Sequence, residues 1–173
     1  PPQGSGQAGK KRLPGFSGEW VEKKLGELFT NRRETNCNDL PLLSITATRG
    51  VINREELEKK DSSNENKSKY LRIAPGDIGF NTMRMWQGVS ALSDLEGIVS
   101  PAYTICTPVD SLCGRFIAHL FKLPKTISLF HRFSQGLVAD TLNLKYPNFA
   151  VIEIKVPPTK EEQTAIAQVL DTA

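Results

Sequence analysis

The stretch YLRIAPGDIGFNTMRMWQG, residues 70–88, decides the predicted fold, because two apolar, β-branched runs flank a tight turn. Residues 69–74 and 78–82 predict short strands. The Pro75-Gly76 pair between them favours a type II turn, since proline fixes the first φ angle and glycine supplies the positive φ that follows. Residues 81–88 then combine one cation, two amides and one indole ring in a predicted bend. The segment predicts a strand-rich scaffold that carries polar loops.

Strands and helices are also predicted on both sides of this segment. A short strand and a helical turn are expected over 20–29, and further strands over 42–47, 89–92, 98–107, 142–144 and 150–156. An exposed helix is expected over 54–60. Beyond residue 110 the apolar period changes to three or four residues, which predicts helices over 111–123 and 126–133. The predicted fold class is therefore α+β: a twisted, mostly antiparallel β-sheet domain with a few packed helices.

The predicted core draws on both the strands and the helices. Its expected members are Leu43, Ile45, Ile73, Ile78, Phe80, Ile105, Phe116, Leu120, Ile152 and Ile154. Near the C-terminal end, Thr159 and Glu162 have the spacing of a capping box. The apolar stripe Ile166, Val169 and Leu170 follows, and it predicts that a helix starts at residue 159.

Composition excludes several classes of protein. The chain has 173 residues, 39% apolar and 24% charged, which suits one folded domain. No run approaches the roughly 18 apolar residues of a membrane span. Cys37, Cys106 and Cys113 form no Cys-x-x-Cys motif, so neither a disulfide framework nor a structural zinc site is indicated. A reducing, cytoplasmic setting is expected.

Charge is distributed unevenly along the chain, although the net charge is only +3. Residues 111–150 carry a net charge of +4, whereas residues 91–110 carry −3. This alternation predicts one basic face on a chain that is not basic as a whole. The alternative is a surface of mixed, solvated charges.

Sequence motifs for common chemistries are absent. There is no P-loop and no Gly-x-Ser-x-Gly. Residues 4–9, GSGQAG, match Gly-x-Gly-x-x-Gly, but no strand precedes them, so a dinucleotide site is rejected. Residues 1–9 are expected to be a flexible N-terminal linker or an expression remnant. His119 and His131 lie in the predicted helical region and are assigned to helix packing, so no metal site is expected.

One catalytic pattern suggests a possible function, that of a metal-dependent nuclease. Asp140 precedes Glu153 and Lys155 by 13 and 15 residues, an order that resembles the acid and (Asp/Glu)-x-Lys arrangement of metal-dependent nucleases. Alternating charges on an exposed edge strand give the same pattern without any catalytic role. Another possible function is that of a protein-interaction module that does not act on DNA.

Several motifs together resemble the target-recognition domain of a type I restriction–modification specificity subunit. They are, in chain order, Leu13-Pro-Gly-Phe-Ser-Gly-Glu-Trp20, Leu25-Gly-Glu-Leu28, Leu42-Leu-Ser-Ile-Thr46, Pro75-Gly-Asp-Ile-Gly-Phe-Asn-Thr-Met-Arg-Met-Trp-Gln-Gly88, Gly97-Ile-Val-Ser-Pro-Ala-Tyr103, Ser134-Gln-Gly136 with Leu142-Asn-Leu144, and Val156-Pro-Pro158 with Glu161-Glu-Gln-Thr-Ala-Ile-Ala167. Each piece alone is weak, but their order covers residues 10–173.

The resemblance implies a non-catalytic, cofactor-free DNA reader. Residues 10–158 would form the recognition domain and residues 159–173 the start of a long spacer helix. The implied partners are double-stranded DNA, methyltransferase (modification) subunits, a restriction/translocase subunit and a second recognition domain. Ser100-Pro-Ala-Tyr103 lacks the pattern of a methyltransferase tetrapeptide, so the chemistry is assigned to partner subunits. With one recognition domain and no long helices, the chain is expected to be a fragment, a truncated subunit or a half-subunit.

Polar loops supply the predicted DNA contacts. The residues expected to face DNA are Thr48, Arg49, Asn53, Arg54, Lys67, Lys69, Arg132, Ser134 and Gln135. Arg49, Arg54 and Gln135 are the predicted base readers, because forked or amide heads make bidentate contacts with base edges. The predicted phosphate holders are the cations Lys67, Lys69 and Arg132.

Overall fold

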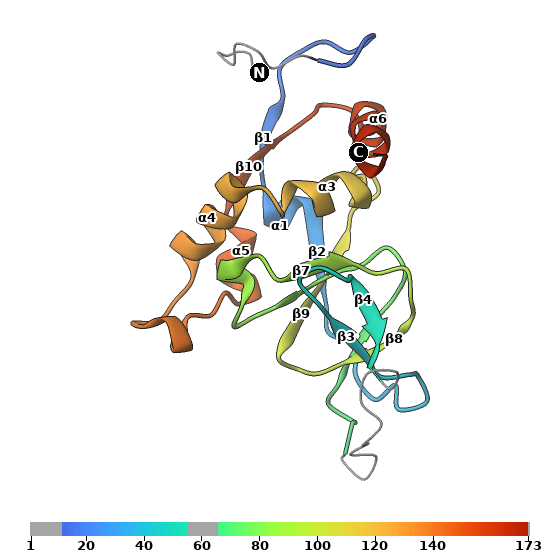
Figure 1. Cartoon of the computed structure of the whole chain (residues 1–173), viewed down its shortest axis with the longest axis vertical. Helices are drawn as coiled ribbons and strands as arrows, with labels where there is room; N and C mark the ends of the chain where they lie inside the picture. Colours follow the sequence, from blue (N-terminus) through green and yellow to red (C-terminus); the bar gives the residue numbers. More distant parts are fainter. Residues whose placement is uncertain (1–11, 55–65, 173) are drawn as a thin grey trace.

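The computed structural model describes residues 12–54 and 66–172 (Figure 1). The predicted linker 1–9 and residues 55–60 of the predicted exposed helix lie outside the described residues. The elements are, in chain order, β1 (Val21–Lys24), α1 (Leu25–Leu28), β2 (Phe29–Arg32), β3 (Leu43–Ile45), β4 (Val51–Asn53), β5 (Leu71–Ile73), β6 (Ile78–Asn81), η1 (Met85–Gln87), β7 (Ser90–Leu92), β8 (Gly97–Val99), β9 (Tyr103–Pro108), α3 (Gly114–Leu120), α4 (Pro124–Phe133), η2 (Ala139–Thr141), α5 (Tyr146–Ala150), β10 (Glu153–Val156) and α6 (Lys160–Asp171).

The strands form several small antiparallel sheets. A four-stranded sheet has the order β2-β9-β6-β7, and the two-stranded pairs are β1-β10, β3-β4 and β5-β8. Helices α3, α4 and α5 lie beside the four-stranded sheet, and the β1-β10 pair lies at the end of the molecule nearest α6 (Figure 1). The α+β class with antiparallel strands is confirmed, but the strands are divided among these sheets rather than joined in one.

The Pro75-Gly76 turn is present and forms a corner between two sheets. Gly76 has a φ of +94°, and the Asp77 N–H donates to the Ala74 carbonyl at 3.0 Å. The flanking strands then separate, because β5 pairs with β8 whereas β6 pairs with β7 and β9. The Asp77 carboxylate is buried and accepts hydrogen bonds from Arg32 Nε (2.7 Å), the Ala74 N–H (2.9 Å) and the Thr107 hydroxyl (2.9 Å). One buried carboxylate thus ties the corner to β2 and β9.

The predicted strand over 98–107 is wrong in one respect, because it is two strands. A turn at Ser100–Ala102 separates β8 from β9, and the Tyr103 N–H donates to the Ser100 carbonyl at 3.0 Å. Pro101 lacks the N–H that an interior strand position needs. The break lets β8 pair with β5 while β9 lies between β2 and β6.

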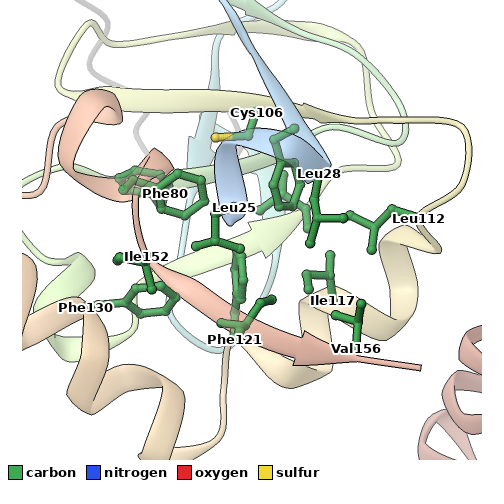
Figure 2. Packing of buried hydrophobic residues seen from close by; sticks show 14 of the residues in the cluster. Leu25, Leu28, Phe80, Cys106, Leu112, Ile117, Phe121, Phe130, Ile152 and Val156 are labelled. Atoms are coloured by element: carbon green, nitrogen blue, oxygen red, sulfur yellow. The ribbon is translucent and has the colours of Figure 1, made fainter. Parts of the chain in front are cut away.

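The main hydrophobic core lies between the four-stranded sheet and the helices. Figure 2 shows Leu25, Phe121, Phe130 and Ile152 gathered in this cluster. Phe149 is fully buried, and its ring lies within about 6 Å of those of Phe29, Phe80, Phe121, Phe130 and Tyr146. A second, smaller cluster fills the space around β3, β5 and β8. The predicted core residues are buried except Leu120, which is only partly covered because it lies at the end of α3.

The helical boundaries differ from those predicted. Helix α3 starts at Gly114 rather than residue 111, and α4 starts at Pro124 rather than residue 126. Proline suits that first position because its missing N–H would have no helical partner there. The strand predicted over 150–156 begins only at Glu153, after helix α5 ends at Ala150. The strand predicted over 142–144 is reduced to a bridge between Gln135 and Asn143.

Helix α6 is fixed by buried polar groups rather than by the predicted apolar stripe. The Thr159 hydroxyl caps the Glu162 N–H at 3.2 Å, but Glu162 does not complete the capping box. Its carboxylate is buried and receives a two-pronged hydrogen bond from Arg12, with both contacts at 2.7 Å. Gln163, also buried, accepts from the Cys113 N–H at 2.8 Å.

The predicted stripe itself is mostly solvent-facing. Ile166 packs against the main core, whereas Val169 and Leu170 are 52% and 42% exposed. Of the stripe, only Ile166 in the second turn of α6 therefore covers the core.

Candidate nucleic-acid interface

The structure distributes the predicted DNA-facing residues over three places. Thr48 and Arg49 are exposed at the tip of the β3–β4 hairpin, and Asn53 and Arg54 lie at its base. The turn before β5 carries Lys67, half-buried, and Lys69, exposed. Arg132, Ser134 and Gln135 lie at the C-terminal end of α4.

The hairpin tip, residues 46–50, is closed by its own side chains. The Thr46 hydroxyl donates to the Gly50 carbonyl at 2.7 Å and accepts from the Arg49 N–H at 2.8 Å. Gly50 has a φ of +73°, which closes the turn at little steric cost. This leaves the Thr48 and Arg49 side chains facing solvent from a rigid loop.

The second loop, residues 83–88, follows β6 and contains η1. Met85 is fully buried and anchors the loop in the core, while the Trp86 indole N–H donates to the Met83 carbonyl at 3.1 Å. The Trp86 ring lies 5.6 Å from the ring of His131 on α4. Gly88 ends the loop with a φ of +87°. It also lies so close to Ile127 of α4 that a side chain at this position would clash.

Lys122 connects these two loops. It lies between α3 and α4, and its ammonium donates to the Ala47 carbonyl at 3.1 Å and to the Gly88 carbonyl at 2.9 Å. Partial burial lowers the pKa of Lys122, since a desolvated ammonium is harder to keep charged. The hairpin tip and the 83–88 loop are therefore held side by side.

Helix α4 continues this surface with a cationic face. Lys125, Ser128 and Arg132 are exposed and follow one another at three- and four-residue spacing, so they share one side of the helix. Thr126 and Phe130 lie on the buried side. The exposed side thus extends the surface from Lys122 to the C-terminal end of α4.

We call residues 46–50, 83–88 and 122–132 together the acid-free face. Sequence segments 41–54, 78–93 and 111–139 contain no Asp or Glu. Within residues 12–54 and 66–172, no ion pair is formed by the face's five cations, which are Arg49, Arg84, Lys122, Lys125 and Arg132.

Four arginines elsewhere in the fold are paired, although Arg33 forms no ion pair with any described residue. Arg12, Arg32, Arg72 and Arg115 all bind carboxylates. Cations that have no carboxylate neighbour and share one surface attract a polyanion, because little local negative charge opposes it. The acid-free face is therefore the strongest candidate for contact with nucleic acid.

The hairpin base and the 66–70 turn have a mixed charge. Arg72, at the centre of β5, is held between Glu34 (3.0 Å) and Glu96 (2.6 Å). Asn53 lines a shallow hollow that also contains Glu96, and both Asn53 and Arg54 are engaged in interactions within the chain. Asn53 at the hairpin base thus lies in the same hollow as a carboxylate, and Arg72 near the 66–70 turn is paired with two.

At the C-terminal end of α4, some of the predicted residues form hydrogen bonds within the fold. The Ser134 hydroxyl donates to the Phe130 carbonyl at 2.7 Å, which caps the last turn of the helix. The backbones of Gln135 and Asn143 exchange two hydrogen bonds: the Gln135 N–H donates at 2.8 Å and the Asn143 N–H at 2.9 Å. The Gln135 side chain is exposed. Arg132 and Gln135 are consequently the outward-pointing members of this group.

Sequence reasoning did not place three cations of the acid-free face, Arg84, Lys122 and Lys125, among the DNA-facing residues. Arg84 belonged to a loop already noted for its polar groups, but Lys122 and Lys125 were assigned only to helices or their ends. The lack of any acid over residues 111–139 was the available signal. The contact of Lys122 with two distant loops had no local signature, because Ala47 is 75 residues away.

The nuclease pattern gains no geometric support. Glu153 and Lys155 are exposed on β10, opposite Lys24 and Glu22 of β1, as expected for charges on a two-stranded edge. Asp140 lies in η2. Across the part of the chain that the structure describes, no three His, Cys, Asp or Glu side chains are grouped so that they could hold a metal ion.

Neither histidine lies in such a group. His119 donates from Nε2 to Asp171 at 2.6 Å, and His131 lies against Trp86. No helix among the described residues has the length and apolar character needed to span a membrane.

In overall fold, the chain is similar to one portion of the specificity (S) subunits of type I restriction–modification systems. One such structure is the HsdS subunit from Thermoanaerobacter tengcongensis, at 15% identity and a TM-score of 0.56 over 92% of this chain and 39% of that one. The S subunit from M. genitalium is 16% identical, with a TM-score of 0.59 over 94% and 40% of the two chains.

A third similar chain comes from work on complex assembly and conformational transition of the type I restriction–modification system. It is 19% identical, with a TM-score of 0.65 over 94% of this chain and 43% of that one. The chain thus spans about two-fifths of the length of these structures. No protein-family model and no curated protein sequence matches it.

Proposed function

We propose that this chain is a DNA-recognition unit of a type I restriction–modification specificity subunit and that it reads one half of a split site. The observation that carries the proposal is the acid-free face, whose five cations form no ion pair with any described residue, on a fold similar to that of S subunits. DNA is the polyanion that such a surface fits, because phosphates can replace the missing carboxylates as partners of the cations.

Arg49 on the acid-free face and Gln135 just beyond its C-terminal end are suited to base contact. Arg49 projects from the hairpin tip, and its guanidinium can make the bidentate contact with guanine that is the commonest specific one. Gln135, beyond the end of α4, has the amide head that pairs with adenine. Lys125 and Arg132 on the exposed side of α4 are suited to phosphates.

The remaining predicted contacts belong to the second, mixed-charge surface. Lys67 and Lys69 stay proposed phosphate holders, Arg54 stays a proposed base reader, and Asn53 stays a proposed DNA-facing residue. Because carboxylates lie nearby, we expect these residues to contribute less to affinity than the acid-free face does.

The chain itself is proposed to be non-catalytic and to act in the cytoplasm. Cleavage and methylation would belong to the restriction/translocase and modification subunits, and a second recognition domain would read the other half-site. Residues 10–158 would be the reading unit, and α6 would lead into the spacer helix that joins the units.

The direct test is DNA binding by the 173-residue chain as a function of salt. Four to five phosphate contacts should lower the binding constant by about four powers of ten for each tenfold rise in salt. Selection from a random DNA pool should enrich one short sequence. A flat salt response with no enriched sequence would refute the proposal.

A further inference from the structure

Lys122 is the one described side chain whose hydrogen bonds join the hairpin tip to the 83–88 loop. Its ammonium donates to Ala47 of the tip and to Gly88 of the loop, at 3.1 and 2.9 Å. These acceptors lie 75 and 34 residues away in the sequence. Lys122 also joins α3 to α4, so it lies where four elements of the fold meet.

Each loop is shaped by contacts within itself, so the hydrogen bonds of Lys122 act between two formed loops. Thr46 closes the hairpin tip, and the buried Met85 together with the Trp86–Met83 hydrogen bond shapes the 83–88 loop. What these internal contacts do not fix is the separation of the two loops. The two carbonyls on Lys122 tie the loops to one point, because both must lie within hydrogen-bonding distance of a single ammonium.

The chemistry at Lys122 differs from that at a simple phosphate holder. An ammonium has three donors, and here two are used within the protein. Lys125, three residues on, is exposed, and its side chain forms no hydrogen bond or ion pair with any residue in 12–54 or 66–172. The pair therefore offers a matched comparison of two lysines, one engaged with both loops and one free.

We propose that Lys122 is a positioning residue that sets the spacing of the hairpin tip and the 83–88 loop, and thereby the base preference of the acid-free face. This inference rests on the proposed DNA-reading function. It assigns base discrimination to a residue that contacts loop backbone rather than bases. Loss of the ammonium should let the loops move independently, so that Arg49 no longer meets one base pair in one geometry.

The test compares Lys122→Met with Lys125→Met in the 173-residue chain. Affinity is measured on the selected DNA site and on every single-base variant, at two salt concentrations. We expect Lys125→Met to weaken all sequences alike and to reduce the salt slope by about one. We expect Lys122→Met to reduce discrimination about tenfold at one or more base positions, beyond any uniform loss.

Three outcomes separate the hypotheses. If Lys122→Met weakens all sequences uniformly, as Lys125→Met should, Lys122 is only a phosphate holder and the inference is wrong. If the wild-type chain shows no base preference at all, the proposed function fails and this inference fails with it. If the wild-type chain prefers one DNA sequence and only Lys122→Met alters the base discrimination, the proposed function and this inference are both supported.

A second variant keeps the test decisive if Lys122→Met does not fold. Lys122→Arg keeps the charge but replaces a compact ammonium with a longer, planar fork. It should leave the salt slope unchanged while shifting base discrimination, because one loop must move to accommodate it. An unchanged base profile in Lys122→Arg would overturn the positioning role.

Discussion

At the scale of single residues, the fold depends on a few buried polar side chains that each join distant segments. Asp77 connects a turn to β2 and β9, and Glu162 connects α6 to Arg12. Both carboxylates are 1% exposed, and both are satisfied by arginine. A buried carboxylate without its partners would be costly, so these contacts specify how the segments meet.

Asp77→Ala should therefore be strongly destabilising. It removes the acceptor for Arg32, Thr107 and the Ala74 N–H at once. We expect the free energy of unfolding to fall by about 3 kcal/mol, the lower end of the range for breaking a buried pair, since Arg32 keeps partial access to water. Urea denaturation measures this change, with the exposed Asp94→Ala as the matched control. Equal stability of the two variants would show that the Asp77 network carries little energy.

Gly79→Ala tests the packing of the smaller hydrophobic cluster, to which Ile45, Ile73 and Ile105 belong. A Cβ at Gly79 would lie 2.4 Å from Ile45 Cδ1 and 3.2 Å from both Ile73 and Ile105. We expect destabilisation of about 1–3 kcal/mol, typical of an overfilled core. Because Ile45→Val shortens the closest neighbour, it should recover part of the loss in the double variant. Additive losses would contradict the assigned contact.

At the scale of elements, α6 is attached to α3 by a surface ion cluster as well as by buried groups. Asp171 accepts from the His119 ring at 2.6 Å and from Arg115 Nε at 2.8 Å. These two hydrogen bonds, that from His119 first, hold the pKa of Asp171 below its usual value of 3.8. The cluster is solvent-accessible, so its contribution is modest and screened by salt.

The sign of the resulting pH dependence follows from this lowered pKa. The stabilisation is present above the unfolded-state value near 3.8, and it is lost as the pH falls through the lower folded-state pKa. Asp171→Asn should thus be less stable than the wild type at neutral pH, and the difference should shrink below about pH 4. Thermal unfolding across that range checks it. A difference independent of pH would mean that the carboxylate charge plays no part.

Elements whose formation depends on neighbouring residues in the sequence were predictable, whereas those that depend on contacts between distant segments were not. The Pro75-Gly76 turn, β6 and α4 follow from residues that act on their immediate neighbours. Helix α5 was missed because its five residues are too few to show a helical period, and its stability comes from Phe149 in the core. The pairing of β5 with β8 rather than β6 depends on the corner at Asp77.

The candidate site was only partly visible in the sequence, for the same reason. Arg49 and Arg132 could be named because they lie in polar loops or at helix ends. Lys122 could not, since its role depends on carbonyls brought together by the fold.

At the scale of the whole molecule, the charges are divided between two kinds of surface. Arginines at structural junctions are neutralised by carboxylates, whereas the cations of the acid-free face are not. A folded domain gains little from leaving like charges together, because they repel one another. The arrangement is explained if the face binds a polyanion.

The most direct measurement compares DNA affinity after charge reversal on two sets of lysine and arginine residues. The test variant is Arg49→Glu/Lys125→Glu/Arg132→Glu on the acid-free face, and the control is Lys23→Glu/Lys145→Glu/Lys155→Glu, which changes the net charge equally. At moderate salt we expect the face variant to lose at least about a hundredfold in affinity for the selected site, and the control to stay within about threefold of the wild type. Equal losses in the two variants, or a larger loss in the control, would contradict the assignment of DNA binding to the acid-free face.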